Sequence, residues 1–216
     1  MATVVRVNQQ AGQRLAELGI DPAILRRAVE AGEMAGDACT EHDPPGFRGY
    51  TQWGVCSRMV RIGLAPLKWT RRNRQNLPLA VSPDGKMCIT VATGDAATGI
   101  EEANPQTKNP RGIVTQAAII ENINQLFLFE EMEKERAERE SEVRALTWIL
   151  LFHRDRDIIR CELSLPRAWD QQGRVSEWEE RLILEPVGIA DVSRIMPEEQ
   201  GPAIDVEVER KNVKEG

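Results

Sequence analysis

The sequence feature that most constrains the fold is a tight turn between two short runs of alternating apolar residues. The turn is Pro-Asp-Gly at residues 83–85, and the runs cover residues 77–81 and 87–92. Alternation with a period of two is typical of a strand, and Pro-Asp-Gly favours a sharp reversal of the chain. The sequence therefore predicts a β-hairpin. Pro78 predicts that the first strand lies at a sheet edge, because proline cannot donate a ladder hydrogen bond.

A second hairpin is predicted between residues 146–153 and residues 158–165, which are joined by a charged turn. The second of these runs alternates an apolar face with a face that carries Glu162, and a solvent-facing position would explain that carboxylate. Two shorter runs, at 181–184 and 203–209, also fit strands, and the latter alternates like an edge strand.

Helices are predicted before and after the first hairpin. Residues 10–18 and 22–35 have helical apolar spacing. Gly19 fits the left-handed position that follows a helix, and Asp21 fits the cap that precedes one. A third helix is expected over residues 50–64, where the apolar residues again form one stripe.

The middle of the chain holds three more predicted segments. Residues 93–99 are rich in Gly and Thr and are expected to form a flexible surface loop. Residues 113–126 have the apolar spacing of an amphipathic helix. Residues 130–144 are a charge run with Glu–Lys and Glu–Arg pairs four apart, which indicates a solvated helix or a partly ordered excursion.

These patterns predict an α+β fold, in which a helical N-terminal portion is followed by a mainly antiparallel sheet with a long packed helix. We expect a helical hairpin over residues 1–43 and an α+β main domain over residues 44–216, with the charged helical excursion at about 130–144. A chain of 216 residues can bury a core without disulfides, so the four widely spaced cysteines are expected to be reduced thiols.

No apolar run approaches the roughly 20 residues that a membrane-spanning helix needs. The first residues also lack the apolar stretch of a secretory signal. We therefore expect a cytoplasmic protein that does not enter membranes. No motif predicts a cofactor.

The segment from Pro44 to Pro83, called the basic segment below, carries seven Lys or Arg residues and no Asp or Glu. The whole chain has a net charge of −6, so the rest of the sequence carries −13. Four of the ten aromatic residues also lie in this segment. A basic stretch with interleaved aromatics inside an acidic protein points to an anionic partner, most strongly to nucleic acid.

The predicted nucleic-acid contacts combine cations for phosphate with a ring for base stacking. No catalytic motif accompanies them, so the leading hypothesis is a non-enzymatic binding protein whose affinity falls with salt. A structural alternative stays open, in which Trp53 and Trp69 belong to the core and the cations pair with the acidic second half. The predicted contact residues are Arg58, Arg61, Lys68, Trp69, Arg71, Arg72 and Arg74.

Two other functions fit the sequence. Residues 113–216 hold 14 basic and 23 acidic residues, so this half could dock a basic protein or pair with the basic half of a second copy. Alternatively, Asp155, Asp157 and Glu162 could hold Mg²⁺ in a divergent metal-dependent nuclease, since carboxylates are ligands that Mg²⁺ prefers. The lysine that often accompanies such carboxylates is missing.

Overall fold

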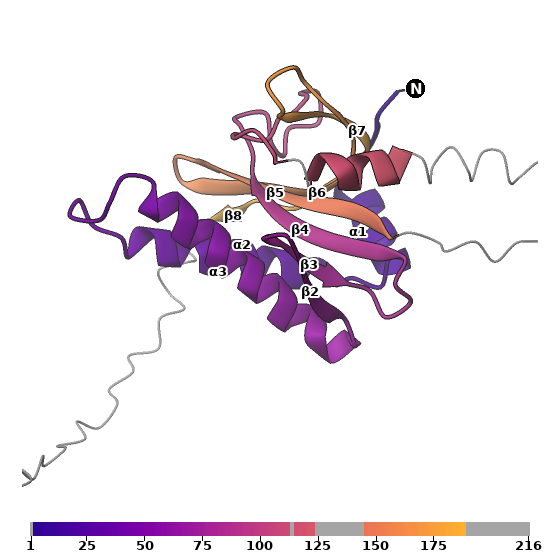
Figure 1. Ribbon diagram of the computed structural model, residues 1–216, viewed down its shortest axis with the longest axis horizontal. Coiled ribbons are helices and arrows are strands. Elements are labelled where there is room, and N and C mark those ends of the chain that lie inside the picture. Colours follow the sequence, from indigo (N-terminus) through magenta and orange to yellow (C-terminus); the bar gives the residue numbers. More distant parts are fainter. Residues whose placement is uncertain (1, 113–114, 124–144, 189–216) are drawn as a thin grey trace, which may run out of the picture.

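The computed structural model describes residues 2–112, 115–123 and 145–188. Within these ranges the strands form one eight-stranded mixed sheet, with helices packed against it (Figure 1). Most neighbouring strands run antiparallel, so the predicted α+β class with a mainly antiparallel sheet is confirmed. None of the helices in these ranges is long and apolar enough to cross a membrane.

The sheet contains both predicted hairpins and joins them through a parallel pair. A parallel pair needs a crossover connection, here between β4 (Met87–Thr93) and β5 (Leu146–Asp155). The helical residues 115–123 of this connection lie on the opposite side of the sheet from the three N-terminal helices. A second parallel pair joins β1 to β7. Across the sheet the order is β1 (Val4–Arg6), β7 (Val175–Ile183), β6 (Ile158–Trp169), β5 (Leu146–Asp155), β4 (Met87–Thr93), β3 (Leu77–Val81) and β2 (Thr70–Arg74), with β8 (Val187–Gly188) also pairing with β6.

Local signals set the ends of the first two helices as predicted. The first, α1 (Asn8–Glu17), is followed by Gly19 with a φ of +70°. The second, α2 (Pro22–Asp37), is preceded by its cap residue Asp21, whose Oδ1 accepts a 2.9 Å hydrogen bond from the Ala23 N–H. This carboxylate satisfies one of the backbone donors that a helix start leaves unpaired.

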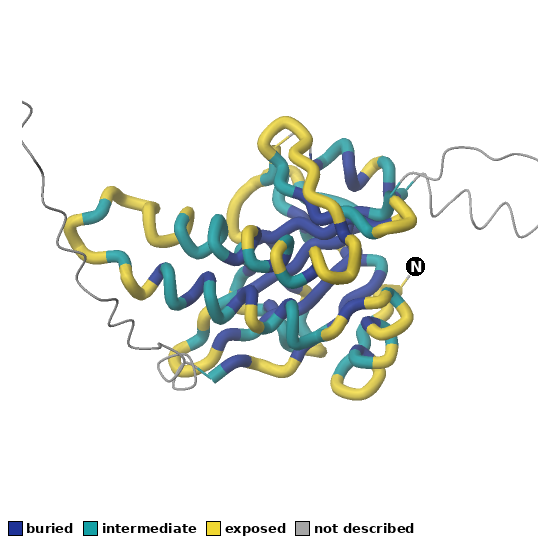
Figure 2. Tube along the Cα trace, turned by 90° about the horizontal axis from the view of Figure 1, so that it is seen from below, coloured by how far each residue is buried: buried dark blue, intermediate teal, exposed yellow. Residues whose placement is uncertain are grey.

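The third helix, α3 (Phe47–Leu64), packs antiparallel against α2, and the short 3₁₀ turn η1 (Ala65–Leu67) follows it. This helical hairpin extends past the sheet, and its projecting end is exposed (Figures 1 and 2). The predicted division of the chain at residue 43 falls in the loop between α2 and α3, and it stays a prediction.

Glycines allow the close contact between α2 and α3. A Cβ added at Gly32 would lie 2.8 Å from the Gln52 carbonyl oxygen and 3.0 Å from the Cys56 Cβ. A Cβ at Gly63 would lie 2.5 Å from a methyl group of Ile24. Because backbone atoms cannot move aside as a flexible side chain can, Gly32 sets the distance between the two helices.

Side chains alternate between two cores on opposite faces of the sheet. In β5, Trp148 and Leu150 face α1, α2 and α3, whereas Ile149 and Leu151 face the helical residues 115–123. Both faces of the central strands are therefore covered, and β4 and β5 read as nearly continuous buried runs.

The structure corrects the prediction for the first hairpin. Residues 70–74, for which no strand was predicted above, form β2 and pair with β3 through a turn at Gln75 and Asn76, with φ values of +43° and +69°. The first strand of the hairpin is therefore not an edge strand, although it contains Pro78. Proline is tolerated because β3 pairs with β4 only through Ala80 and Val81.

Other boundaries also differ from the predictions. Strand β6 continues past Pro166 to Trp169, with irregular register around that proline. Strand β7 begins at Val175 instead of 181. The predicted helix 113–126 is described, and helical, over residues 115–123. The charge run at 130–144 and the strand at 203–209 lie outside the described residues.

The four cysteines are free, and three of them are buried. Burial raises the pKa of the Cys161 thiol to about 12, and it also raises the pKa of Cys56. Since the thiolate is the reactive form, these two side chains are protected both by burial and by protonation. Cys39, at the end of α2, is only half-buried.

We expect iodoacetamide at pH 8 to alkylate Cys39 in the folded protein and to leave Cys56 and Cys161 unmodified until urea unfolds the chain. Peptide mass spectrometry of timed samples measures this order, with the urea-denatured protein as the control in which all four thiols react. Modification of Cys161 in the folded protein as fast as Cys39 would contradict the buried positions described above.

We expect Gly32→Ala to lower the free energy of unfolding by about 1–3 kcal/mol, because the new methyl group overlaps the α3 backbone. Gly12→Ala is the matched control, since a Cβ there meets nothing within 4 Å, and it should stabilise by about 0.5–1 kcal/mol. Urea denaturation compares the two variants. Equal effects would show that α2 and α3 are not in close contact at Gly32.

Candidate functional site

A groove of about 520 Å³ lies between α3, η1 and the β2–β3 hairpin, and it is called the α3 groove below. It combines three arginines with apolar and aromatic walls, and no acidic residue is among the described residues that line it. The lining residues are Trp53, Gly54, Ser57, Arg58, Arg61, Ile62, Ala65, Trp69, Arg71 and Pro78.

Helical spacing brings one side of the α3 groove together. Gly54, Arg58 and Arg61 follow one another at intervals of four and three residues, so they lie on one face of α3, and Ala65 of η1 follows directly after the helix. Val60 and Leu64 lie on the buried face, as the predicted core stripe requires. Arg58 and Arg61 therefore share a face of α3 that is separate from this buried one.

The other side of the α3 groove comes from β2, the last strand of the sheet. All five residues of β2 are exposed, and Arg71 from this strand lines the groove. Arg61 ties the two sides together, because its Nη2 donates to the Arg72 carbonyl oxygen at 2.8 Å and to the Asn73 Oδ1 at 2.7 Å.

The two tryptophans belong mainly to the walls of the groove. Trp69 is only 7% exposed and packs in the core shared with α1, α2 and α3. Trp53 is half-buried, and its indole N–H donates to the Val91 carbonyl oxygen at 3.1 Å. Little of the Trp69 ring is therefore available to stack on a ligand, and this matches the structural alternative for that residue.

The described part of the chain places no ion-pair partner against the cations of the α3 groove. Burial lowers the pKa of Arg61, and the nearby charge of Arg71 lowers it further. Among the residues that the structure describes, Arg58, Arg71 and Arg72 form no ion pair. Positive charges that repel one another at the surface are stabilised when an anion binds between them.

Two other cations of the basic segment, Arg74 and Arg48, form ion pairs within the protein. Arg74 forms a two-pronged ion pair with Glu121, with both distances 2.9 Å, and these hydrogen bonds raise the pKa of Arg74. Arg48 pairs with Glu33 and Asp37. Arg74 therefore stands apart from the groove, as does the exposed Lys68 at the end of η1.

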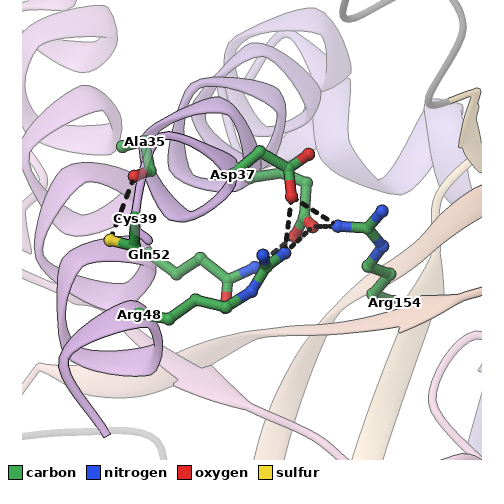
Figure 3. A network of polar contacts seen from close by, with 7 residues as sticks. Ala35, Asp37, Cys39, Arg48, Gln52 and Arg154 are labelled. Carbon is green, nitrogen blue, oxygen red and sulfur yellow. Dashed lines mark hydrogen bonds and ion pairs between the residues drawn. The ribbon is translucent and has the colours of Figure 1, made fainter. Parts of the chain in front are cut away.

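A polar network joins α3 to α2 and to the sheet (Figure 3). The buried Glu33 carboxylate on α2 accepts hydrogen bonds from Arg48, Gln52 and Arg154. Asp37 accepts from Arg48 and Arg154, each at 2.7 Å. Burial alone would raise the pKa of Asp37, but the two arginines outweigh it and lower that pKa. Since Arg154 belongs to β5, the network joins the helical hairpin to the sheet.

The candidate nuclease carboxylates are not brought together. Asp155, at the end of β5, pairs with Arg160 at 3.2 Å, and Asp157 lies in the following turn. Glu162 lies in the buried part of the sheet. Within the ranges that the structure describes, no group of three or more His, Cys, Asp or Glu side chains could hold a metal ion.

Glu162 instead forms a buried ion pair with Arg181, and this corrects its expected position on a solvent-facing surface. Its two carboxylate oxygens accept from the Arg181 Nε at 3.0 Å and from Nη2 at 2.6 Å. They also accept from the Ser164 hydroxyl at 2.7 Å and from the Gly99 N–H at 2.9 Å. The loop at residues 93–99, predicted to be flexible, is therefore packed over β6.

Comparisons of this chain with protein-family models, with curated proteins and with solved structures find no match. The chemistry of the α3 groove is therefore inferred from its own residues.

Sequence reasoning missed the apolar part of the groove. Ile62 is exposed beside the arginines, and the half-buried Pro78 of β3 also lines the groove. The sequence shows where Ile62 lies on the helix. It does not show which side of α3 stays exposed once β2 has packed beside the helix. Ser57 also lines the groove, and its buried hydroxyl has no hydrogen-bond partner among the described residues.

We expect Glu162→Gln to lower the free energy of unfolding by about 3–5 kcal/mol, because it leaves the Arg181 charge buried without a partner. The matched control is Glu185→Gln, which removes an exposed carboxylate 3.1 Å from Arg26 and should cost below about 1 kcal/mol. Thermal and urea unfolding measure both. If the two variants are equally stable, Glu162 is accessible to solvent and returns to consideration as a ligand.

Proposed function

We propose that this protein is a non-enzymatic binding protein that holds nucleic acid in the α3 groove. The observation that carries the proposal is the convergence of Arg58, Arg61 and Arg71 on one groove, where none of the described lining residues is acidic. Two of these arginines come from α3 and one from β2, so the fold gathers charges that are up to 13 positions apart in the sequence.

Arginine suits this role because its planar guanidinium binds phosphate oxygens through paired hydrogen bonds and stays charged in a partly buried site. The exposed Arg72 on the same edge strand extends the positive surface beyond the groove. A protein with a net charge of −6 would repel nucleic acid over most of its surface, so binding is expected to be confined to this area.

The first test measures fluorescence anisotropy of labelled DNA and RNA with the purified protein across a salt series. The logarithm of the affinity should fall linearly with the logarithm of the salt concentration, because bound phosphates release counterions. Absence of binding at low salt would overturn the proposal.

The second test reverses charge in the groove. We expect Arg58→Glu combined with Arg71→Glu to weaken binding about tenfold or more and to reduce the salt slope by about 1.4 for a single strand or 1.8 for a duplex. Arg27→Glu combined with Arg156→Glu is the matched control, since both residues are exposed, lie outside the groove and give the same change in net charge. Equal losses in the two double variants would show that only the overall charge matters.

A further inference from the structure

One face of α3 carries aromatic rings at its first turns and cations at its last turns. Phe47, Tyr50, Gly54, Arg58 and Arg61 are spaced by three or four residues, so they form one continuous stripe. Phe47 is 43% exposed and Tyr50 is 66% exposed. Large aromatic side chains exposed side by side on one helix face are typical of a contact surface.

The aromatic end of this stripe adjoins the α3 groove. The Tyr50 ring lies 5.7 Å from the Trp53 ring, centre to centre, and Trp53 lines the groove. Between the rings and the arginines stands Gly54, where an added Cβ would meet no atom within 4 Å. Among the described residues, none therefore covers the helix surface at Gly54, between the rings and the arginines.

The stripe also has the length of a short polymer. From Phe47 to Arg61 the helix rises roughly 21 Å, at about 1.5 Å per residue. A stacked strand rises about 3.4 Å per nucleotide, so the stripe could hold about six nucleotides. A single nucleotide would reach the arginines or the outer aromatic rings, but not both.

We propose that the ligand of the α3 groove is single-stranded nucleic acid, with unpaired bases stacked on Tyr50 and Phe47 and phosphates bound by Arg58, Arg61 and Arg71. This inference rests on the proposed function and narrows its substrate class. The arginines alone would serve a duplex equally well. Exposed rings beside them add affinity only for bases that are free of a partner strand, because a duplex keeps its base faces stacked on one another.

The test compares a labelled single-stranded DNA 12-mer with the duplex of the same sequence, again by anisotropy. The full chain should bind the single strand more tightly than the duplex. Tyr50→Ala should weaken single-strand binding roughly five- to hundredfold, in the range measured for the loss of one base–aromatic stack. It should leave the salt slope unchanged, since that slope counts phosphates, and it should leave duplex binding unchanged.

Two further variants separate stacking from a structural effect. Tyr50→Phe keeps the ring face and should bind the single strand as the parent does. Ile120→Ala removes an exposed apolar side chain from the helical residues on the opposite face of the sheet, and it should change nothing.

Three outcomes would overturn the inference. Equal affinity for single strand and duplex, with Tyr50→Ala changing neither, would leave the proposed function standing and remove the base contacts. No binding of any nucleic acid at low salt would remove both. Binding of polyglutamate but of no nucleic acid would also remove both, and would make the groove a site for an acidic peptide.

Discussion

The buried ion pair between Glu162 and Arg181 is the interaction on which the two-sided architecture depends. Removing two charges from water is unfavourable unless nearly every polar atom finds a partner. Here the carboxylate has four donors, and the guanidinium also donates to the backbone carbonyl of Ile100. Two of these partners, Gly99 and Ile100, come from the loop after β4, so contacts that stabilise the pair also hold this loop against the second face of the sheet.

Because both faces of the sheet are covered, the sheet is exposed at its edges, one of which is β2. An edge strand with free backbone groups can recruit other chains, and charged side chains are a common protection against this. The arginines of β2 fit that protective role, and at the same time they form one wall of the α3 groove. Under the proposed function, stability and binding would use the same residues, since a strand that carries positive charge to remain unpaired also presents that charge to an anion.

Local chemistry explains which parts of the fold were predictable from the sequence. The cap at Asp21, the glycine at residue 19 and the turn before β4 each act within a few residues, and all three lie where the sequence indicated. Strand β2 was missed because five exposed polar residues show no alternation, and pairing with β3 alone makes them a strand. The position of Glu162 depends on Gly99 and Arg181, which lie far away in sequence.

The candidate site was predictable to a similar extent. Composition singled out the basic segment, and helical spacing placed Arg58 together with Arg61. The sequence did not show which cations form ion pairs within the protein, because the Glu121 partner of Arg74 lies 47 residues away.

The fixed position of α3 in the unliganded protein has a thermodynamic consequence. Gly32 and the Glu33 network already hold this helix rigid, so association would restrict mainly side-chain rotamers, and the entropic penalty of binding would be small for a surface of this length.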